Sequence, residues 1–127
     1  MQNRKKVMQK ALILIKGILA VGCLAPEQKQ KDLRDSVVGE YEYMNTVGDI
    51  HKAVFLDDGI VEEFENGRKL VESKWAIVNG EIQVDVGSKE MPVLRINIDK
   101  SITSIANIKD GKRVDRPKEG HTFKKIK

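Results

Sequence analysis

The sequence predicts an all-β protein, an antiparallel up-and-down meander of about eight strands that forms a small barrel or a strongly bent sheet. Turn residues recur at short intervals after residue 37, and the apolar residues between them alternate with polar ones. This period of two is typical of strands with one buried and one wet face. Consecutive antiparallel strands leave open edges unless the sheet closes, so closure is the favoured arrangement.

Turn sequences divide the segment after residue 37 into short runs. Asn66-Gly67 and Asn79-Gly80 predict the most reliable hairpins, because tight turns of the favoured hand need positive φ, which Gly and Asn adopt at least cost. Further turns are expected at Gly48-Asp49, Asp57-Asp58-Gly59, Gly87-Ser88, Asp99-Lys100 and Asp110-Gly111.

The runs between these turns are the expected strands. They lie near residues 38–46, 51–57, 60–66, 69–78, 81–86, 92–98, 101–108 and 121–126, with a hairpin of poorer quality at Lys112 to Arg116. The alternation predicts that the inward-facing positions include Trp75, Ile77, Ile82, Val84, Val86, Leu94, Ile96 and Ile98.

Charge is distributed unevenly along the chain. The 127 residues include 23 Lys and Arg and 19 Asp and Glu, but five basic and no acidic residues precede Cys23. The remainder therefore has a net charge of −1, and no nucleic-acid partner is expected for it. A single Cys and 40% hydrophobic residues also exclude a disulfide scaffold and a polytopic membrane protein.

Residues 1–22 have the layout of a secretory signal peptide, which would form an N-terminal signal helix. Residues 1–10 carry four positive charges, residues 11–22 are almost wholly apolar, and small residues precede Cys23. As a helix the apolar run would be about 18 Å long, too short for a hydrocarbon core of about 30 Å. Lys16 within this run makes permanent insertion costly, which favours a transient signal.

The segment that ends at Cys23, Leu19-Ala20-Val21-Gly22-Cys23, resembles the lipobox of bacterial lipoproteins. In that family a signal peptidase cuts before the Cys, and the thiol receives diacylglycerol. The resemblance covers about the first 25 residues. It implies lipid attachment at Cys23, membrane anchoring through acyl chains and an extracytoplasmic location in the cell envelope, in the outer membrane if the organism has one. The alternative is an incidental or buried Cys at the end of an amphipathic surface helix.

Residues 24–36 are expected to be a tether. They contain few apolar residues and mixed charge, so they are either flexible or form one short surface helix that begins after Pro26. The predicted organisation is therefore a signal peptide at 1–22, a lipidated Cys and tether at 23–36, and a β domain at 37–127.

Four short motifs follow one another along the β domain. They are Val38-Gly39-Glu40-Tyr41, residues 55–59, residues 75–82 (WAIVNGEI) and residues 94–98 before Asp99. This order resembles the small lipocalin-like domains of exported bacterial lipoproteins and spans most of residues 37–126. The resemblance implies a small barrel that binds a ligand or a partner.

The sequence offers little for catalysis, and no enzyme activity, cofactor or metal site is expected. His51 lies beside a predicted turn and is interpreted as a solvated strand end, and no nucleophile elbow is present. His51 and His121 lack ligand spacing. The acidic pair Asp57-Asp58 before Gly59 is interpreted as a hairpin turn, because a calcium loop needs alternating oxygen ligands and a terminal Glu.

Two groups of charged residues are given structural interpretations. Glu62, Glu63 and Glu65 alternate between the two faces of a short strand, which is interpreted as a charged edge. Residues 109–127 hold eight basic and three acidic residues. Such a tail could contact anionic headgroups or an acidic envelope polymer, but the preferred interpretation is the wet face of the last strand.

These observations favour a non-enzymatic envelope lipoprotein whose small β-barrel binds an envelope protein or a small apolar ligand. A barrel of about 90 residues with six aromatic side chains nearly fills its own interior, so a partner bound at the surface is favoured over an enclosed ligand. A structural or inhibitory envelope protein with no small-molecule site is the alternative, and a hydrolase is the least favoured class.

Overall fold

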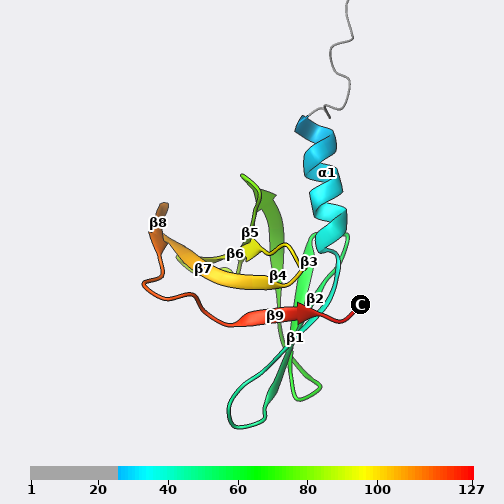
Figure 1. Cartoon of the computed structure of the whole chain (residues 1–127). Coiled ribbons are helices and arrows are strands. Elements are labelled where there is room, and N and C mark those ends of the chain that lie inside the picture. Colours follow the sequence, from blue (N-terminus) through cyan, green and yellow to red (C-terminus); the bar gives the residue numbers. More distant parts are fainter. Residues whose placement is uncertain (1–25) are drawn as a thin grey trace, which may run out of the picture.

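The computed structural model describes residues 26–127, so the predicted signal peptide and Cys23 lie outside the described residues. In the described part, one helix precedes nine strands (Figure 1). The elements are α1 (Pro26–Val37), β1 (Gly39–Met44), β2 (Ile50–Phe55), β3 (Ile60–Glu65), β4 (Arg68–Val78), β5 (Glu81–Asp85), β6 (Glu90–Ile96), β7 (Ile102–Lys109), β8 (Lys112–Asp115) and β9 (Thr122–Lys125).

Eight of these strands form a closed antiparallel barrel. Strands β1 to β7 are neighbours in chain order, and β9 pairs with both β7 and β1, which closes the ring. Strand β8 lies outside the ring as the second arm of a hairpin with β7, in the segment where a poorer hairpin was expected. The predicted all-β meander and its closure are confirmed, although residues 68–73 of β4 pair with β3 alone.

The two hairpins predicted with most weight have the expected backbone geometry. Asn66 and Gly67 have φ of 51° and 84°, and Asn79 and Gly80 have φ of 52° and 79°. Positive φ at both central residues matches the twist of the flanking strands. These turns therefore fix the register of β3 with β4 and of β4 with β5.

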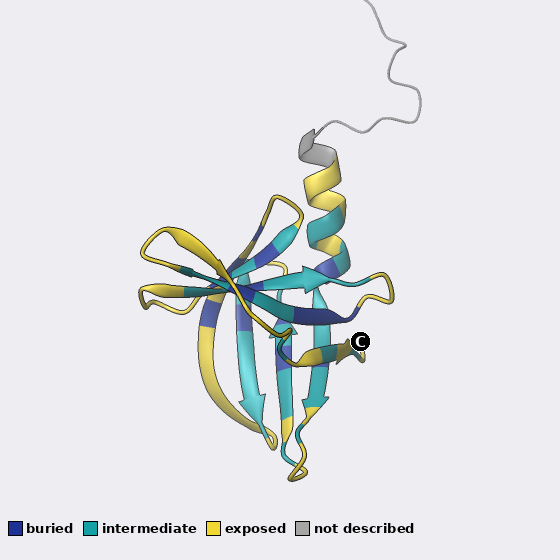
Figure 2. Ribbon diagram, turned by 60° about the vertical axis from the view of Figure 1, so that its left-hand side comes forward, coloured by how far each residue is buried: buried dark blue, intermediate teal, exposed yellow. Residues whose placement is uncertain are grey.

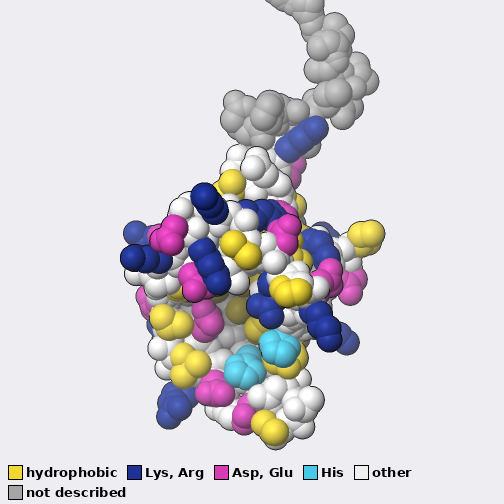
Figure 3. Space-filling view, turned by 90° about the vertical axis from the view of Figure 1, so that its left-hand side faces the viewer, with side chains coloured by type: hydrophobic (Ala, Val, Ile, Leu, Met, Phe, Trp, Pro, Cys, Tyr) yellow, Lys and Arg dark blue, Asp and Glu magenta, His cyan; other side chains and the backbone are white. Residues whose placement is uncertain are grey.

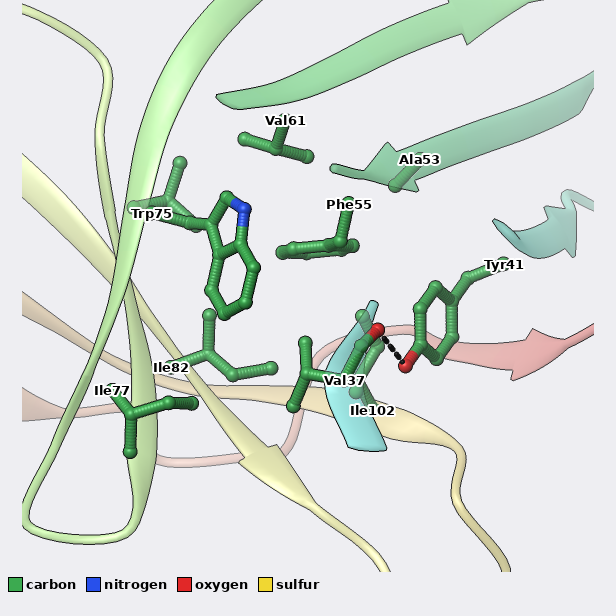
Figure 4. Packing of buried hydrophobic residues seen from close by; sticks show 10 residues of the cluster. Val37, Tyr41, Ala53, Phe55, Val61, Trp75, Ile77, Ile82 and Ile102 are labelled. Atoms are coloured by element: carbon green, nitrogen blue, oxygen red, sulfur yellow. Dashed lines mark hydrogen bonds between the residues drawn. The ribbon is translucent and has the colours of Figure 1, made fainter. Parts of the chain in front are cut away.

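The core fills the half of the barrel next to α1, where Figure 2 shows the buried residues concentrated. The Phe55 ring packs edge-on against both Tyr41 and Trp75, with centroid distances of 5.4 Å in each case (Figure 4). Trp75 and Ile77 face inward as predicted. The buried cluster consists of Val37, Tyr41, Ala53, Phe55, Val61, Trp75, Ile77, Ile82, Val84 and Ile102.

Two residues predicted to face inward, Val86 and Ile98, are exposed. Strand β5 ends at Asp85 and β6 ends at Ile96, so both residues lie in turns instead of strands. The register of β6 against β7 also shifts between Val93 and Leu94. The extra residue lies on β7, so the shift leaves the alternation along β6 unchanged, and the strand ends account for the exposure of Val86 and Ile98.

Helix α1 seals one end of the barrel. It begins at Pro26, so the segment predicted to be either flexible or one short helix is helical from this residue on. The last turns of the helix contact the barrel. Leu33 packs against the core, and the Arg34 guanidinium lies 4.8 Å from the centre of the Trp75 ring. The Gln30 amide donates a hydrogen bond of 2.9 Å to the Ile77 carbonyl. Among residues 26–127, no helix has the length and apolarity needed to cross a bilayer.

Two side chains satisfy the carbonyl groups at the C-terminal end of α1. The Tyr41 hydroxyl donates a hydrogen bond of 2.6 Å to the Val37 carbonyl, and the Lys125 ammonium donates one of 2.7 Å to the Ser36 carbonyl. Burial raises the pKa of Tyr41 to about 12. Helix ends leave such carbonyls without intrahelical partners, so these bonds tie α1 to β1 and β9.

Candidate functional site

The barrel end away from α1 is open and carries both histidines. The loops that join β1 to β2 and β3 to β4 lie at this end (Figure 1). Figure 3 shows the two histidine side chains next to each other at the edge of a hollowed face. We call this group of side chains the barrel mouth, and it consists of Tyr43, His51, Glu63, Glu65, His121 and Phe123.

The inward positions of β2 and β3 change from apolar to titratable along the strands. Phe55 is opposite Val61 at the sealed end, whereas His51 is opposite Glu65 at the open end. Between them, Glu63 is opposite Ala53. Because side chains at every second position share a face, one alternating pattern builds both the core and the barrel mouth.

An aromatic wall lies on one side of the barrel mouth. The Tyr43 ring stacks on His121 with a centroid distance of 4.1 Å, and it lies 5.9 Å from His51 and 5.7 Å from Phe123. His51 and His121 are 70 positions apart in the sequence. They meet because β9 pairs with β1, which carries Tyr43, and β2 pairs with the other edge of β1.

An apolar recess of about 130 Å³ lies between the core and the barrel mouth. An engineered cavity of about 150 Å³ is large enough to bind benzene, so the recess can hold only a small group. Its lining consists of Ala53, Phe55, Val61, Glu63, Val84, Pro92, Leu94, Ile102 and Phe123.

Glu63 is the one charged residue in the lining of the recess. Burial raises the pKa of this carboxyl group, and the nearby charge of His51 opposes the rise. Within the described residues, no side chain forms a hydrogen bond or an ion pair with Glu63. The neighbouring carboxylate of Glu65 lies 4.0 Å from His51 Nε2. The barrel mouth therefore places two carboxyl groups, Glu63 and Glu65, above an apolar floor.

The interpretation of the three glutamates as a charged edge is wrong. Strand β3 pairs along its length with both β2 and β4, so it has no free edge in the closed barrel. The predicted alternation is confirmed: Glu62 faces outward and binds Lys69, whereas Glu63 lines the recess. Glu63 shares its face with Val61, and this spacing is the signal in the sequence that could have placed it inside a barrel.

The acidic turn residues singled out in the sequence lie apart from the barrel mouth. Asp57, Asp58 and Gly59 form the predicted turn between β2 and β3, where the Asp58 carboxylate accepts a hydrogen bond from the Ile60 amide. No group of three or more potential metal ligands occurs within residues 26–127. The two histidines, distant in sequence, are brought together at the barrel mouth, but they belong to no such group among the described residues.

The basic C-terminal segment is partly neutralised by contacts within the fold. Arg113 binds the carboxylates of Glu81 and Asp115, and the Glu119 carboxylate binds Arg95. The Lys125 ammonium group donates its hydrogen bond to the Ser36 carbonyl at the C-terminal end of α1. These contacts support the interpretation of this segment as structural.

Exposed apolar side chains lie near two hairpins at the open end. The hairpin between β1 and β2 exposes 64% of Met44 and 79% of Val47, and Ile50 is also exposed. Leu70 and Val71 are exposed near the start of β4. We call these five residues the apolar rim. Exposed apolar side chains gathered at one end of a small domain are typical of a contact surface.

The fold and the barrel mouth define a small closed antiparallel β-barrel that is sealed by a helix at one end and open at the other. Comparison of the chain with models of protein families, with curated proteins and with solved structures found no match.

Proposed function

We propose that this chain is a membrane-anchored extracytoplasmic lipoprotein and that its barrel is a non-enzymatic binding module that contacts its partner through the open end. The single observation that carries the proposal is the opposition of the two barrel ends. Cys23 precedes Pro26, the first residue of α1, by three residues, and the other end of α1 seals the barrel. An anchor at Cys23 would hold the sealed end near the bilayer and turn the barrel mouth away from it.

The apolar rim supports a protein partner at the open end. Met44 and Val47 expose most of their surface, although burying them would be favourable. The recess of about 130 Å³ is smaller than the roughly 300 to 1,000 Å³ of common small-molecule pockets. A surface partner therefore accounts for the open end better than a large enclosed ligand does.

The anchoring part of the proposal is tested by metabolic labelling with a fatty-acid analogue. We expect label in the wild-type protein and none in Cys23→Ala, because the thiol is the only one in the chain. Absence of label from both proteins, with residues 1–22 retained, would contradict the lipoprotein proposal. Residues 1–22 would then be reconsidered as an amphipathic surface helix.

The binding part is tested by a photo-crosslinking residue at Val47, with Val114 as the matched control. Both are exposed valines, but Val47 belongs to the apolar rim and Val114 lies on β8, outside the barrel ring. We expect one envelope protein to crosslink at Val47 and not at Val114. Identical products at both positions, or none at Val47, would contradict docking at the open end.

A further inference from the structure

We propose that the recess binds a small primary amine, which enters with its alkyl tail first and leaves its ammonium group beside Glu63. This inference rests on the proposed binding role of the open end and adds a ligand class to it. Three features support it: the apolar floor of the recess, the Glu63 carboxyl group at its entrance, and the position of that carboxyl group nearer the open end than the floor.

The floor of the recess suits an alkyl group. Phe55 and Val61 are fully buried at its deep end, and the side chains of Val84, Leu94 and Ile102 complete the apolar lining. The volume of about 130 Å³ is close to that of a cavity that accepts a benzene-sized group. A tail of about four to five carbons is of this size, whereas a long acyl chain is too large.

The entrance suits a cation. A half-buried carboxylate with no hydrogen-bond donor loses hydration without compensation, and a bound ammonium group would restore both charge balance and hydrogen bonds. Glu65 adds a second carboxylate near Glu63, and Phe123, which lines the recess, adds an aromatic ring whose face can attract a cation. The same two carboxylates disfavour a fatty acid or any other anion.

Because the carboxyl group lies at the entrance and the apolar floor lies deeper, the recess distinguishes a free amine from a lysine side chain of a protein. Glu63 lies two residues nearer the open end than Val61, which is about 7 Å along a strand. A free amine that enters tail first places its ammonium group at Glu63. A lysine side chain enters with its ammonium group first and would place the charge on the floor beside Phe55, so the free amine fits better.

The test compares three probes of equal length: n-pentylammonium, 1-pentanol and pentanoate. Each is titrated at pH 7, where an alkylamine is charged, into the full chain mixed with zwitterionic phosphatidylcholine nanodiscs, with nanodiscs alone as the control for partition into lipid. Methyl NMR signals of Val84, Leu94 and Ile102 report on the recess, and those of Val78 and Ile98 report on exposed surface elsewhere.

We expect n-pentylammonium to bind about tenfold more tightly than 1-pentanol, because both can donate a hydrogen bond to the Glu63 carboxylate but only the cation also balances its charge. Glu63→Gln should abolish this preference, and Glu62→Gln, on the opposite face of the same strand, should retain it. Equal binding of the alcohol, a preference that survives in Glu63→Gln, or shifts no larger in the recess than at Ile98 would overturn the inference. This titration requires neither lipid attachment nor a protein partner, so its failure is distinguishable from failure of the labelling and crosslinking experiments.

Discussion

The sealed and open ends of the barrel are built by the same strands but have opposite chemistry. At the sealed end, Tyr41 and Phe55 are buried, and the Tyr41 hydroxyl is bonded to the end of α1. At the open end, the next inward positions toward the loops are Tyr43 on β1 and, beyond Ala53, His51 on β2, and both remain partly exposed. The barrel thus uses one half for stability and leaves the other half available for contacts.

A closed barrel of about 90 residues therefore need not be filled along its whole length. A helix that contributes Leu33 and Val37 to one end completes a core that the strands alone leave open. With that end closed, titratable side chains at the other end cost little stability. Substitutions at paired inward positions are therefore the most direct way to test the comparison.

The largest expected effect is the contrast between Phe55→Ala and His51→Ala, two inward positions of β2. Phe55 is 2% exposed and contacts both Tyr41 and Trp75, so its truncation should lower the free energy of unfolding by about 3 to 5 kcal/mol. His51 lies at the barrel mouth, and His51→Ala should change it by about 0.5 kcal/mol or less. Urea denaturation followed by Trp75 fluorescence measures both values. Similar losses for the two variants would show that the open end is also part of the structural core.

The strand pattern was predictable from the sequence because it depends on local physics. Asn66-Gly67 and Asn79-Gly80 fix their turns through their own backbone preferences, and alternation placed Trp75 and Ile77 inside. The position of Ile98 was predicted wrongly because β6 ends at Ile96, and the end of a strand depends on its pairing, here with β7.

The candidate site was much less predictable, because it forms only when distant strands meet. His51 and His121 share Tyr43 as a neighbour through the closure of β9 on β1, and nothing in their local sequence indicates this. Glu63 was correctly placed on one face of its strand, but the assumed free edge hid its inward position in the recess. Only closure of the ring converts that face into the interior.

The next effect in size concerns the hydroxyl group that joins the barrel to α1. Tyr41→Phe removes the donor of a buried hydrogen bond and leaves the Val37 carbonyl without it, so we expect a loss of about 1 to 2 kcal/mol at pH 8. The matched control is Tyr43→Phe, since the Tyr43 hydroxyl forms no hydrogen bond with a described residue, and its loss should be near zero. Thermal unfolding of both variants gives the comparison, and equal losses would contradict a special role for the sealed end.

The pH dependence of Tyr41 follows from the sign of its shift. Its folded pKa of about 12 lies above the unfolded value of about 10, so protonated Tyr41 stabilises the fold fully below pH 10. This contribution is lost as the pH rises from about 10 to 12. The wild-type protein should therefore lose stability over this range more steeply than Tyr41→Phe. Parallel pH profiles for the two proteins would show that Tyr41 ionises without affecting folding.

The smallest expected effect is a gain in stability at the open end. Burial raises the folded pKa of Glu63, so the protonated carboxyl stabilises the fold below the unfolded pKa, and this advantage is lost as pH rises through the folded pKa. At pH 7 the charged form is therefore unfavourable, and Glu63→Gln should raise the free energy of unfolding by on the order of 0.5 kcal/mol. The gain should disappear below about pH 4, where Glu63 is protonated in both states.

Glu62→Gln is the control for this gain, because it removes an outward carboxylate that binds Lys69. It should leave stability unchanged or slightly lower at pH 7. Chemical denaturation of both variants at pH 7 and at pH 4 measures the difference. A loss of stability in Glu63→Gln at pH 7 would mean that the Glu63 carboxylate supports the fold. The open end would then resemble the sealed end, where every inward side chain contributes to stability, instead of holding a charge at a cost that a bound cation can offset.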